Sequence, residues 1–268
     1  MSGKQLPDNP EHLIRLLILA LSLSFLPACT HLKSDLVDHD GHAVEIVQAG
    51  QGADTVVFES GPDADWSPWD KVEYDLTDDA RVFANSRPGN GRSDDATTPR
   101  DPATFVEELR GLLSSQEVAP PYVLVGHSNG GGNMEVFAKA HPEEVSAVVL
   151  VDPRPRNLLD VCESEGIDMC GIPDDTLATR PEIVQEEYVA YTQATDEITG
   201  EFGACSVRVL SGTKYPGQSE GWMALFQSMQ GDLAAEAVDG EHTLIDGPHN
   251  LQVFEWRDVS DVIRAVLP

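Results

Sequence analysis

The sequence predicts an α/β domain in which a mostly parallel β-sheet is covered by helices. Short apolar runs alternate with segments of helical spacing from residue 35 onward, and this alternation is typical of such a sheet. One apolar run, at 122–125, leads through the pentapeptide Gly-His-Ser-Asn-Gly at 126–130 into a glycine-rich helical segment. Residues 30–268 contain no repeat or linker, so they are expected to form a single domain with a full hydrophobic core.

The predicted elements follow in a regular order. Strands are predicted at residues 36–37, 43–47, 55–58, 81–84, 122–125, 147–151, 207–210 and 243–245. The runs at 55–58 and 122–125 are expected to be buried strands. Helices are predicted after Asp101-Pro102, after Gly130, from Pro181 onward and at 259–266, because apolar side chains recur there at helical spacing.

The chain between the sixth and seventh predicted strands is long enough to form a lid. This insertion spans about 153–204 and contains several prolines, two close cysteines and one convincing helix. Pro181 opens that helix, and one of its faces carries Val184, Tyr188 and Tyr191.

Ser128 is the candidate nucleophile because a G-x-S-x-G turn between a buried strand and a helix is typical of a nucleophile elbow. The turn forces an unusual backbone conformation, and glycine two residues before and after the serine is expected to leave room for substrate. A serine hydroxyl is a weak nucleophile until a base takes its proton. His249 is the candidate base because it follows the last predicted strand across a turn, whereas His242 and His127 are less suitably placed.

Five segments resemble the α/β-hydrolase family, and together they cover nearly all of the chain after its first 29 residues. They are ESGP at 59–62, RPGNGRSD at 87–94, and the stretches 120–131, 148–153 and 247–252. The resemblance is greatest to bacterial esterase-like hydrolases with a short lid. It implies the α/β-hydrolase fold, in which a mostly parallel central sheet is flanked by helices and a lid is inserted between the sixth and seventh strands.

The resemblance also implies which backbone groups would stabilise an oxyanion. The family takes one N–H from the residue after the nucleophile, which here is Asn129, and a second from the loop after the third strand. Gly61 can donate in that loop, whereas Pro62 has no N–H. Glu59 stands where members with an H-G-G-P-G segment have histidine.

The acid partner of the histidine has two candidates. Most family members carry it after the penultimate strand in a G-x-x-D pattern, but residues 212–215 read Gly-Thr-Lys-Tyr. Asp152 follows the predicted strand at 147–151, a position that some members use instead. Asp152 is the favoured acid, and Glu220 is the alternative.

The resemblance implies a serine hydrolase that cleaves a carboxylic ester of a small or medium substrate through an acyl-enzyme on Ser128. Neither a cofactor nor a metal ion is expected. One alternative is an aminopeptidase-like amide hydrolase, which the Gly61-Pro62 loop favours. Another is a catalytically silent relative that binds a ligand or partner. Epoxide hydrolases and dehalogenases are disfavoured, because both need an aspartate at position 128.

Residues 1–29 are predicted to be a signal peptide. Lys4 and Arg15 precede an apolar run at 16–26 that is too short to span a bilayer comfortably and ends in Leu-Pro-Ala-Cys. This tetrapeptide resembles the lipobox of bacterial lipoproteins, which implies lipidation of Cys29 and anchoring in the cell envelope, at the outer membrane or its periplasmic face. Simple secretion and an uncleaved N-terminal anchor are the alternatives.

The formal net charge is −29, from 17 basic and 46 acidic residues. This charge argues against nucleic acids and anionic membrane surfaces as partners, but it does not indicate a substrate. The family resemblance implies a small-molecule ester as the ligand.

Three cysteines lie beyond the predicted signal peptide. In an exported protein Cys162 and Cys170 would close a small loop and leave Cys205 free. Pairing of either one with Cys205 is the alternative.

Overall fold

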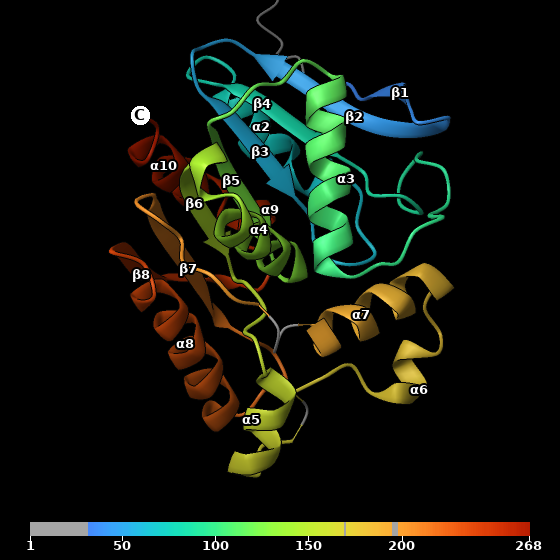
Figure 1. Ribbon diagram of the computed structural model, residues 1–268. Coiled ribbons are helices and arrows are strands. Elements are labelled where there is room, and N and C mark those ends of the chain that lie inside the picture. The colour runs from blue at the N-terminus through green and yellow to red at the C-terminus, as the bar shows by residue number, and fades with distance from the viewer. Residues whose placement is uncertain (1–31, 169, 195–197) are drawn as a thin grey trace, which may run out of the picture. The chain divides into compact units, whose positions relative to one another are not determined.

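The computed structural model describes residues 32–168, 170–194 and 198–268, and the predicted signal peptide with Cys29 lies outside them. Residues Leu32–Pro268 form one compact unit. Its centre is an eight-stranded sheet with the strand order β1-β2-β4-β3-β5-β6-β7-β8 (Figure 1). The strands are β1 (Asp35–His39), β2 (His42–Gly50), β3 (Thr55–Glu59), β4 (Arg81–Asn85), β5 (Tyr122–His127), β6 (Val145–Val151), β7 (Ser206–Lys214) and β8 (Asp239–Pro248).

The predicted mostly parallel sheet is confirmed. Antiparallel pairing joins β1 to β2 and β2 to β4, and the other neighbouring strands pair in parallel. Strands β3 and β5 are buried along their whole length, as expected for strands covered on both faces. Parallel strands end at one edge of the sheet, so the residues that follow β3, β5, β6, β7 and β8 come close together there.

Helices cover both faces of this sheet. They are η1 (Ser67–Trp69), α2 (Asp70–Leu76), α3 (Pro102–Ser115), α4 (Asn129–Ala140), η2 (Pro142–Glu144), α5 (Leu158–Glu165), α6 (Asp174–Leu177), α7 (Glu182–Ala194), α8 (Glu220–Ala235), α9 (Leu251–Phe254) and α10 (Trp256–Ala265). Side chains of α3, α4 and α8 pack in one hydrophobic cluster, and those of α2, α9 and α10 pack in another. Among the described residues, no helix combines the length and apolar character that crossing a membrane requires.

The long helix α8 was missed by the sequence analysis. Glu220, the alternative acid, is the first residue of this helix. Ser219 caps the helix by accepting a hydrogen bond from the N–H of Trp222. The buried face then carries Phe226 and the polar Gln230, which interrupts the apolar spacing that normally reveals a helix.

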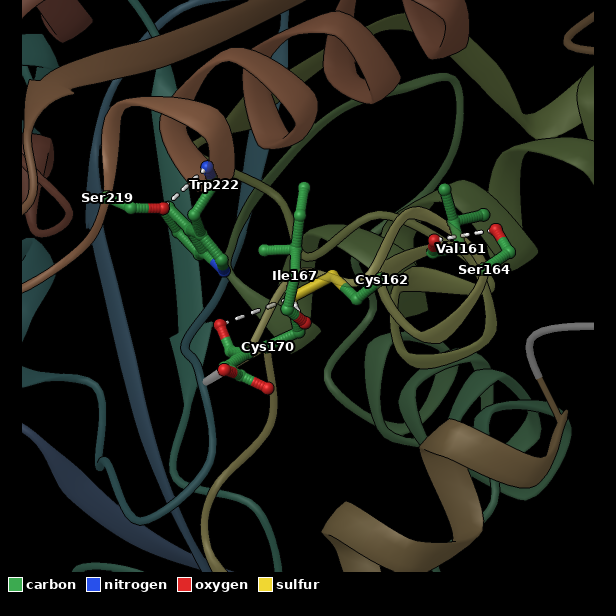
Figure 2. The surroundings of a disulfide bond; sticks show 8 residues. Val161, Cys162, Ser164, Ile167, Cys170, Ser219 and Trp222 are labelled. Carbon is green, nitrogen blue, oxygen red and sulfur yellow. Dashed lines mark hydrogen bonds between the residues drawn. A yellow bond between two sulfur atoms is a disulfide. The ribbon is translucent and has the colours of Figure 1, made fainter.

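The segment between β6 and β7 contains α5, α6 and α7, where the sequence analysis expected a single helix. Cys162 on α5 forms a disulfide with Cys170, while Cys205 is buried and free. The sequence left the cysteine pairing open. The structure contains the Cys162–Cys170 pairing, which closes the small loop. Figure 2 shows this disulfide beside Ile167 and Trp222, and these side chains pack in one apolar cluster that joins α5 to α8.

Glu73 carries a fully buried carboxyl group. It lies on the buried face of α2, and neither side-chain oxygen has a hydrogen-bond partner among the described residues. Burial, and secondarily the charge of Asp70, raise the pKa of Glu73 well above its ordinary value of 4.5. The folded chain therefore holds this proton more tightly than the unfolded chain, and stability is lost as the pH rises above about 4.5.

We expect Glu73→Gln to raise the free energy of unfolding at pH 7 by about 1 kcal/mol or more. The glutamine amide is neutral at every pH, so the folded chain no longer has to keep a carboxyl group protonated at pH 7. Denaturant unfolding measures the difference, which should shrink as the pH is lowered to about 4. The matched control is Glu165→Gln at the exposed end of α5, which should change stability by less than about 0.5 kcal/mol. If the two substitutions changed the free energy of unfolding equally at pH 7, the buried carboxyl group of Glu73 would not be the cause of the lost stability.

Candidate active site

Ser128 occupies a strained turn between β5 and α4. Its backbone has φ +55° and ψ −126°, a region that non-glycine residues seldom adopt and that is common at functional sites. The turn is held by neighbouring strands, since the N–H of Ser128 donates to the carbonyl of Val151 at 3.2 Å. The serine side chain lies at the wall of a pocket of about 570 Å³.

Gly126 and Gly130, the two glycines of the G-x-S-x-G turn, were expected to leave room for substrate. Their surroundings indicate a different role. A Cβ at Gly126 would lie 2.5 Å from the carbonyl oxygen of Gly130, and one at Gly130 would lie 2.3 Å from that of Ser60. These glycines therefore do not make room for substrate. They allow the first turn of α4 to press against the end of β5 and the loop that follows β3.

His249 and Asp152 are brought together by the tertiary structure. His249 immediately follows β8 and Asp152 immediately follows β6. The Nδ1 atom of His249 lies 2.6 Å from Oδ2 of Asp152. The Asp152 side chain is fully buried, whereas that of His249 is 40% exposed. His249 lines the same pocket as Ser128.

Asp152 is held as a hydrogen-bond acceptor by groups that the sequence analysis did not identify. Its Oδ1 accepts from the backbone N–H of Gly212 at 3.1 Å, from the hydroxyl of Tyr215 at 2.6 Å and from the side-chain amide of Gln230 at 3.2 Å. Tyr215 is the residue that stands where most family members have their acid. Burial, followed by the charge of Asp152, raises the pKa of the Tyr215 hydroxyl, so Tyr215 remains a donor.

Glu220 and His242, which the sequence offered as alternative acid and base, do not contact the pair of His249 and Asp152 in these roles. Glu220 is exposed at the start of α8, and its carboxylate is not the partner of His249. His242 lies within β8 and its Nε2 is 2.6 Å from the hydroxyl of Ser211. Burial lowers the pKa of His242, and the charge of Asp152 partly offsets this effect.

The proposed oxyanion donors flank the serine. Asn129 is the first residue of α4, and backbone N–H groups in the first turn of a helix have no partner within that helix. Gly61 follows β3 on the other side, where an added Cβ would lie 3.3 Å from Cβ of Ser128. Both residues line the pocket.

Residues 54–185 match the family model of the alpha/beta hydrolase fold. The chain has the α/β-hydrolase fold.

Solved structures of α/β hydrolases support this assignment along the length of the chain. Epoxide hydrolase VrEH1 from Vigna radiata is similar with a TM-score of 0.67 and 14% identity, over 89% of this chain and 98% of that protein. A thermophilic esterase from Thermogutta terrifontis, with malate bound, gives a TM-score of 0.60 and 18% identity over 88% and 97%. At such identities the likeness is one of fold alone.

Similarity to curated sequences covers shorter stretches. YqjL of Bacillus subtilis strain 168 is 32% identical over 104 residues, which are 39% of this chain and 41% of that protein. The chain thus spans less than half the length of that relative.

His127, which precedes Ser128, contacts the loop that carries His249. Its Nε2 lies 3.1 Å from the backbone oxygen of His249, and the two rings are 4.6 Å apart. A carbonyl oxygen only accepts, so Nε2 of His127 carries the proton. Complete burial, and then repulsion by a charged His249, lower the pKa of His127 well below its ordinary value. His127 is therefore a neutral positioning residue.

Potential metal ligands gather at one place in the described part of the chain. Atoms of His141, Glu143 and Glu144 lie within 4.8 Å of one another at the end of α4 and in η2. None of the three lines the pocket beside Ser128.

Arg87 braces the loop that carries Gly61. Its guanidinium donates to the carbonyl of Ser60 at 2.7 Å and to that of Gly61 at 2.9 Å. It also forms ion pairs with Glu59 at the end of β3 and with Glu187 on α7, the latter at 2.8 Å. Glu59 stands where members with an H-G-G-P-G segment have histidine. In this protein it is a buried counter-ion for Arg87. The buried side chain of Arg87 therefore connects helix α7 with the loop beside Ser128.

We expect Arg87→Lys to lower kcat for the ester hydrolysis that the resemblance implies by about 10-fold to 100-fold, with a smaller change in KM. Lysine keeps the positive charge but cannot hold two carbonyls and two carboxylates at once. Steady-state kinetics with a chromogenic ester measures the effect. The control is Arg92→Lys, in the same segment, whose side chain is 51% exposed and pairs with Glu45. An unchanged kcat in Arg87→Lys, with folding intact, would show that the loop keeps its shape without this brace.

Proposed function

We propose that this protein is a serine hydrolase that cleaves carboxylic esters through an acyl-enzyme on Ser128. The observation that carries the proposal is the 2.6 Å contact between His249 Nδ1 and the buried carboxylate of Asp152, beside a serine in a strained elbow. A nucleophile, a base and an orienting carboxylate at the ends of neighbouring strands are what acyl transfer requires.

Asp152 determines which nitrogen of His249 can act. Because Nδ1 donates to Asp152, the proton of the neutral imidazole lies on Nδ1, and Nε2 is left as the base. In the first step Nε2 accepts the proton of Ser128 while Oγ forms a bond to the acyl carbon. The proton then passes to the alkoxide oxygen as its bond to the acyl carbon breaks, and the alcohol leaves.

The negative charge of the tetrahedral intermediate would be held by the N–H groups of Gly61 and Asn129. In the second step water gives a proton to His249 and attacks the acyl carbon, and the returning proton releases Ser128 and the carboxylic acid. No step requires a cofactor. The pocket of about 570 Å³ has the size of a site for a small or medium substrate.

Ester hydrolysis is preferred to epoxide opening in spite of the likeness to an epoxide hydrolase. Position 128 is serine, whereas the nucleophile of epoxide hydrolases and dehalogenases in this family is an aspartate. A serine can form an acyl-enzyme that water cleaves, and the esterase from Thermogutta terrifontis offers an example of ester chemistry on the same fold.

The test is covalent labelling combined with turnover. A fluorophosphonate probe should label the wild-type protein at Ser128, as located by peptide mass spectrometry, and a p-nitrophenyl ester should be hydrolysed with a burst or steady release of nitrophenol. Faster turnover of a matched p-nitroanilide would favour the amide hydrolase instead. A protein that neither labels nor turns over would be the catalytically silent relative, and the proposal would be wrong.

We further propose that the protein is exported and anchored to the cell envelope by a lipid on Cys29. The motivation is the apolar run at 16–26 followed by Leu-Pro-Ala-Cys. Expressed in a bacterial host with a labelled fatty acid, the wild-type protein should incorporate the label and sediment with membranes, whereas Cys29→Ser should do neither. Cys205→Ser is the matched control and should retain both properties. A mature protein cut elsewhere, without label, would indicate simple secretion.

A further inference from the structure

Among the residues that the structure describes, Arg154 has no carboxylate partner, unlike most other arginines of this acidic protein. Ion pairs hold the side chains of Arg87, Arg92, Arg100, Arg110, Arg156, Arg180, Arg208 and Arg264. Within the described part of the chain, the contact recorded for the Arg154 guanidinium is instead the ring of Tyr188, whose centroid lies 5.0 Å from its central carbon. This half-buried cation lines the pocket beside Ser128.

The backbone of Arg154 is fixed with respect to the nucleophile. Its N–H donates to the carbonyl of Ser128 at 3.1 Å, and its own carbonyl accepts from the hydroxyl of Tyr191 on α7 at 3.0 Å. The ring of Tyr188, on the same helix, supports the guanidinium, and its hydroxyl accepts from the N–H of Ile172. Stacking on an aromatic ring restricts the arginine and leaves its N–H edges free for a planar anion.

The charges around this pocket favour an anion despite the net charge of the chain. Of the 268 residues 46 are acidic, yet none of the described residues that line the pocket is an aspartate or glutamate. The other cation at its wall, Lys214, pairs with Asp246 at 3.0 Å. Asp152 lies behind His249, fully buried and accepting four hydrogen bonds. Among the described residues at this wall, Arg154 is therefore the cation without a carboxylate partner.

We propose that Arg154 binds an anionic group of the substrate, so that the preferred esters carry an ionised carboxylate or phosphate in addition to the ester bond. This inference rests on the proposed ester hydrolysis and specifies its substrate class. An oxyanion on the guanidinium would gain charge-assisted hydrogen bonds, and it would place the ester relative to a serine whose carbonyl already holds the arginine.

The test compares two p-nitrophenyl esters with acyl chains of equal length, p-nitrophenyl pentanoate and mono-p-nitrophenyl glutarate, at constant ionic strength. Arg154→Gln should lower kcat/KM for the glutarate ester by about 10-fold or more and change that for the pentanoate by less than about 3-fold. Arg154→Lys should retain part of the preference. The matched control is Arg257→Gln, because Arg257 is exposed and likewise stacks on an aromatic ring, that of Trp256 at 4.1 Å.

A second arm measures binding without turnover and identifies the anion. Calorimetric titration of the Ser128→Ala variant with glutarate and with glycerol 3-phosphate should detect binding of at least one of these anions. Adding Arg154→Gln to this variant should abolish that binding. The anion that binds identifies the group.

The outcomes separate this inference from the proposed function. Hydrolysis of the pentanoate, with equal losses on both esters in Arg154→Gln and no binding of either anion, would overturn the anion site while the serine hydrolase stands. Hydrolysis of neither ester by the wild-type protein, together with arginine-dependent binding, would overturn the hydrolase and leave an anion-binding pocket.

Discussion

Ser128→Ala is expected to reduce ester turnover by about 10⁴-fold or more, and His249→Ala by a similar factor. In the proposed mechanism the serine supplies the atom that carries the acyl group, and the histidine supplies the Nε2 that removes its proton. Removal of either side chain therefore removes a step that the mechanism needs. When two residues act in the same step, the losses caused by replacing each of them are not additive. The double variant should therefore have a turnover within a few-fold of that of either single variant. Steady-state kinetics with a p-nitrophenyl ester, at enzyme concentrations high enough to detect residual turnover, measures these losses.

Folding must be unchanged for this result to bear on the chemistry. Ser128 has φ +55°, and alanine tolerates that backbone no worse than serine, so the circular dichroism spectrum and thermal midpoint should match the wild type. His127→Gln is a useful comparison, because His127 contacts the backbone of His249 and is not the base of the proposed mechanism. Turnover above about a hundredth of the wild-type rate in Ser128→Ala would rule out the serine as the nucleophile.

Asp152→Asn is expected to lower kcat by roughly 10⁴-fold. The amide keeps the size of the side chain but removes the negative charge that stabilises the imidazolium. It can also turn an NH₂ group toward Nδ1 of His249, which would force the imidazole proton onto Nε2 and remove the base. The loss should appear in kcat, while binding of the substrate remains close to that of the wild type.

Glu220→Gln is the matched control for this experiment, because Glu220 is the rival acid and lies exposed at the start of α8. It should leave kcat within about 2-fold of the wild type, since exposed substitutions rarely perturb a distant site. Tyr215→Phe removes one donor to Asp152 and should cost far less than Asp152→Asn. A large loss in Glu220→Gln with none in Asp152→Asn would transfer the acid to α8.

The amino-acid sequence by itself determined the features that depend on local patterns. Apolar runs and helical spacing indicated the order of strands, and the G-x-S-x-G turn after the run at 122–125 indicated Ser128 as the candidate nucleophile. His249 was indicated by its place after the last strand. These signals are readable because periodicity and turn chemistry act over a few residues. Helix α8 escaped because its buried face includes Gln230, whose amide donates to Asp152 and to the carbonyl of Pro153.

Only the tertiary structure decided which distant residues meet. Asp152 and His249 are 97 positions apart in the chain, and Arg87 and Glu187 are 100 apart. No local pattern encodes such pairs, because they depend on parallel strands that end at one edge of the sheet and on the path of the segment between β6 and β7. Burial then selects the partners, since a carboxylate or guanidinium removed from water is tolerated only where other groups satisfy its charge and hydrogen bonds.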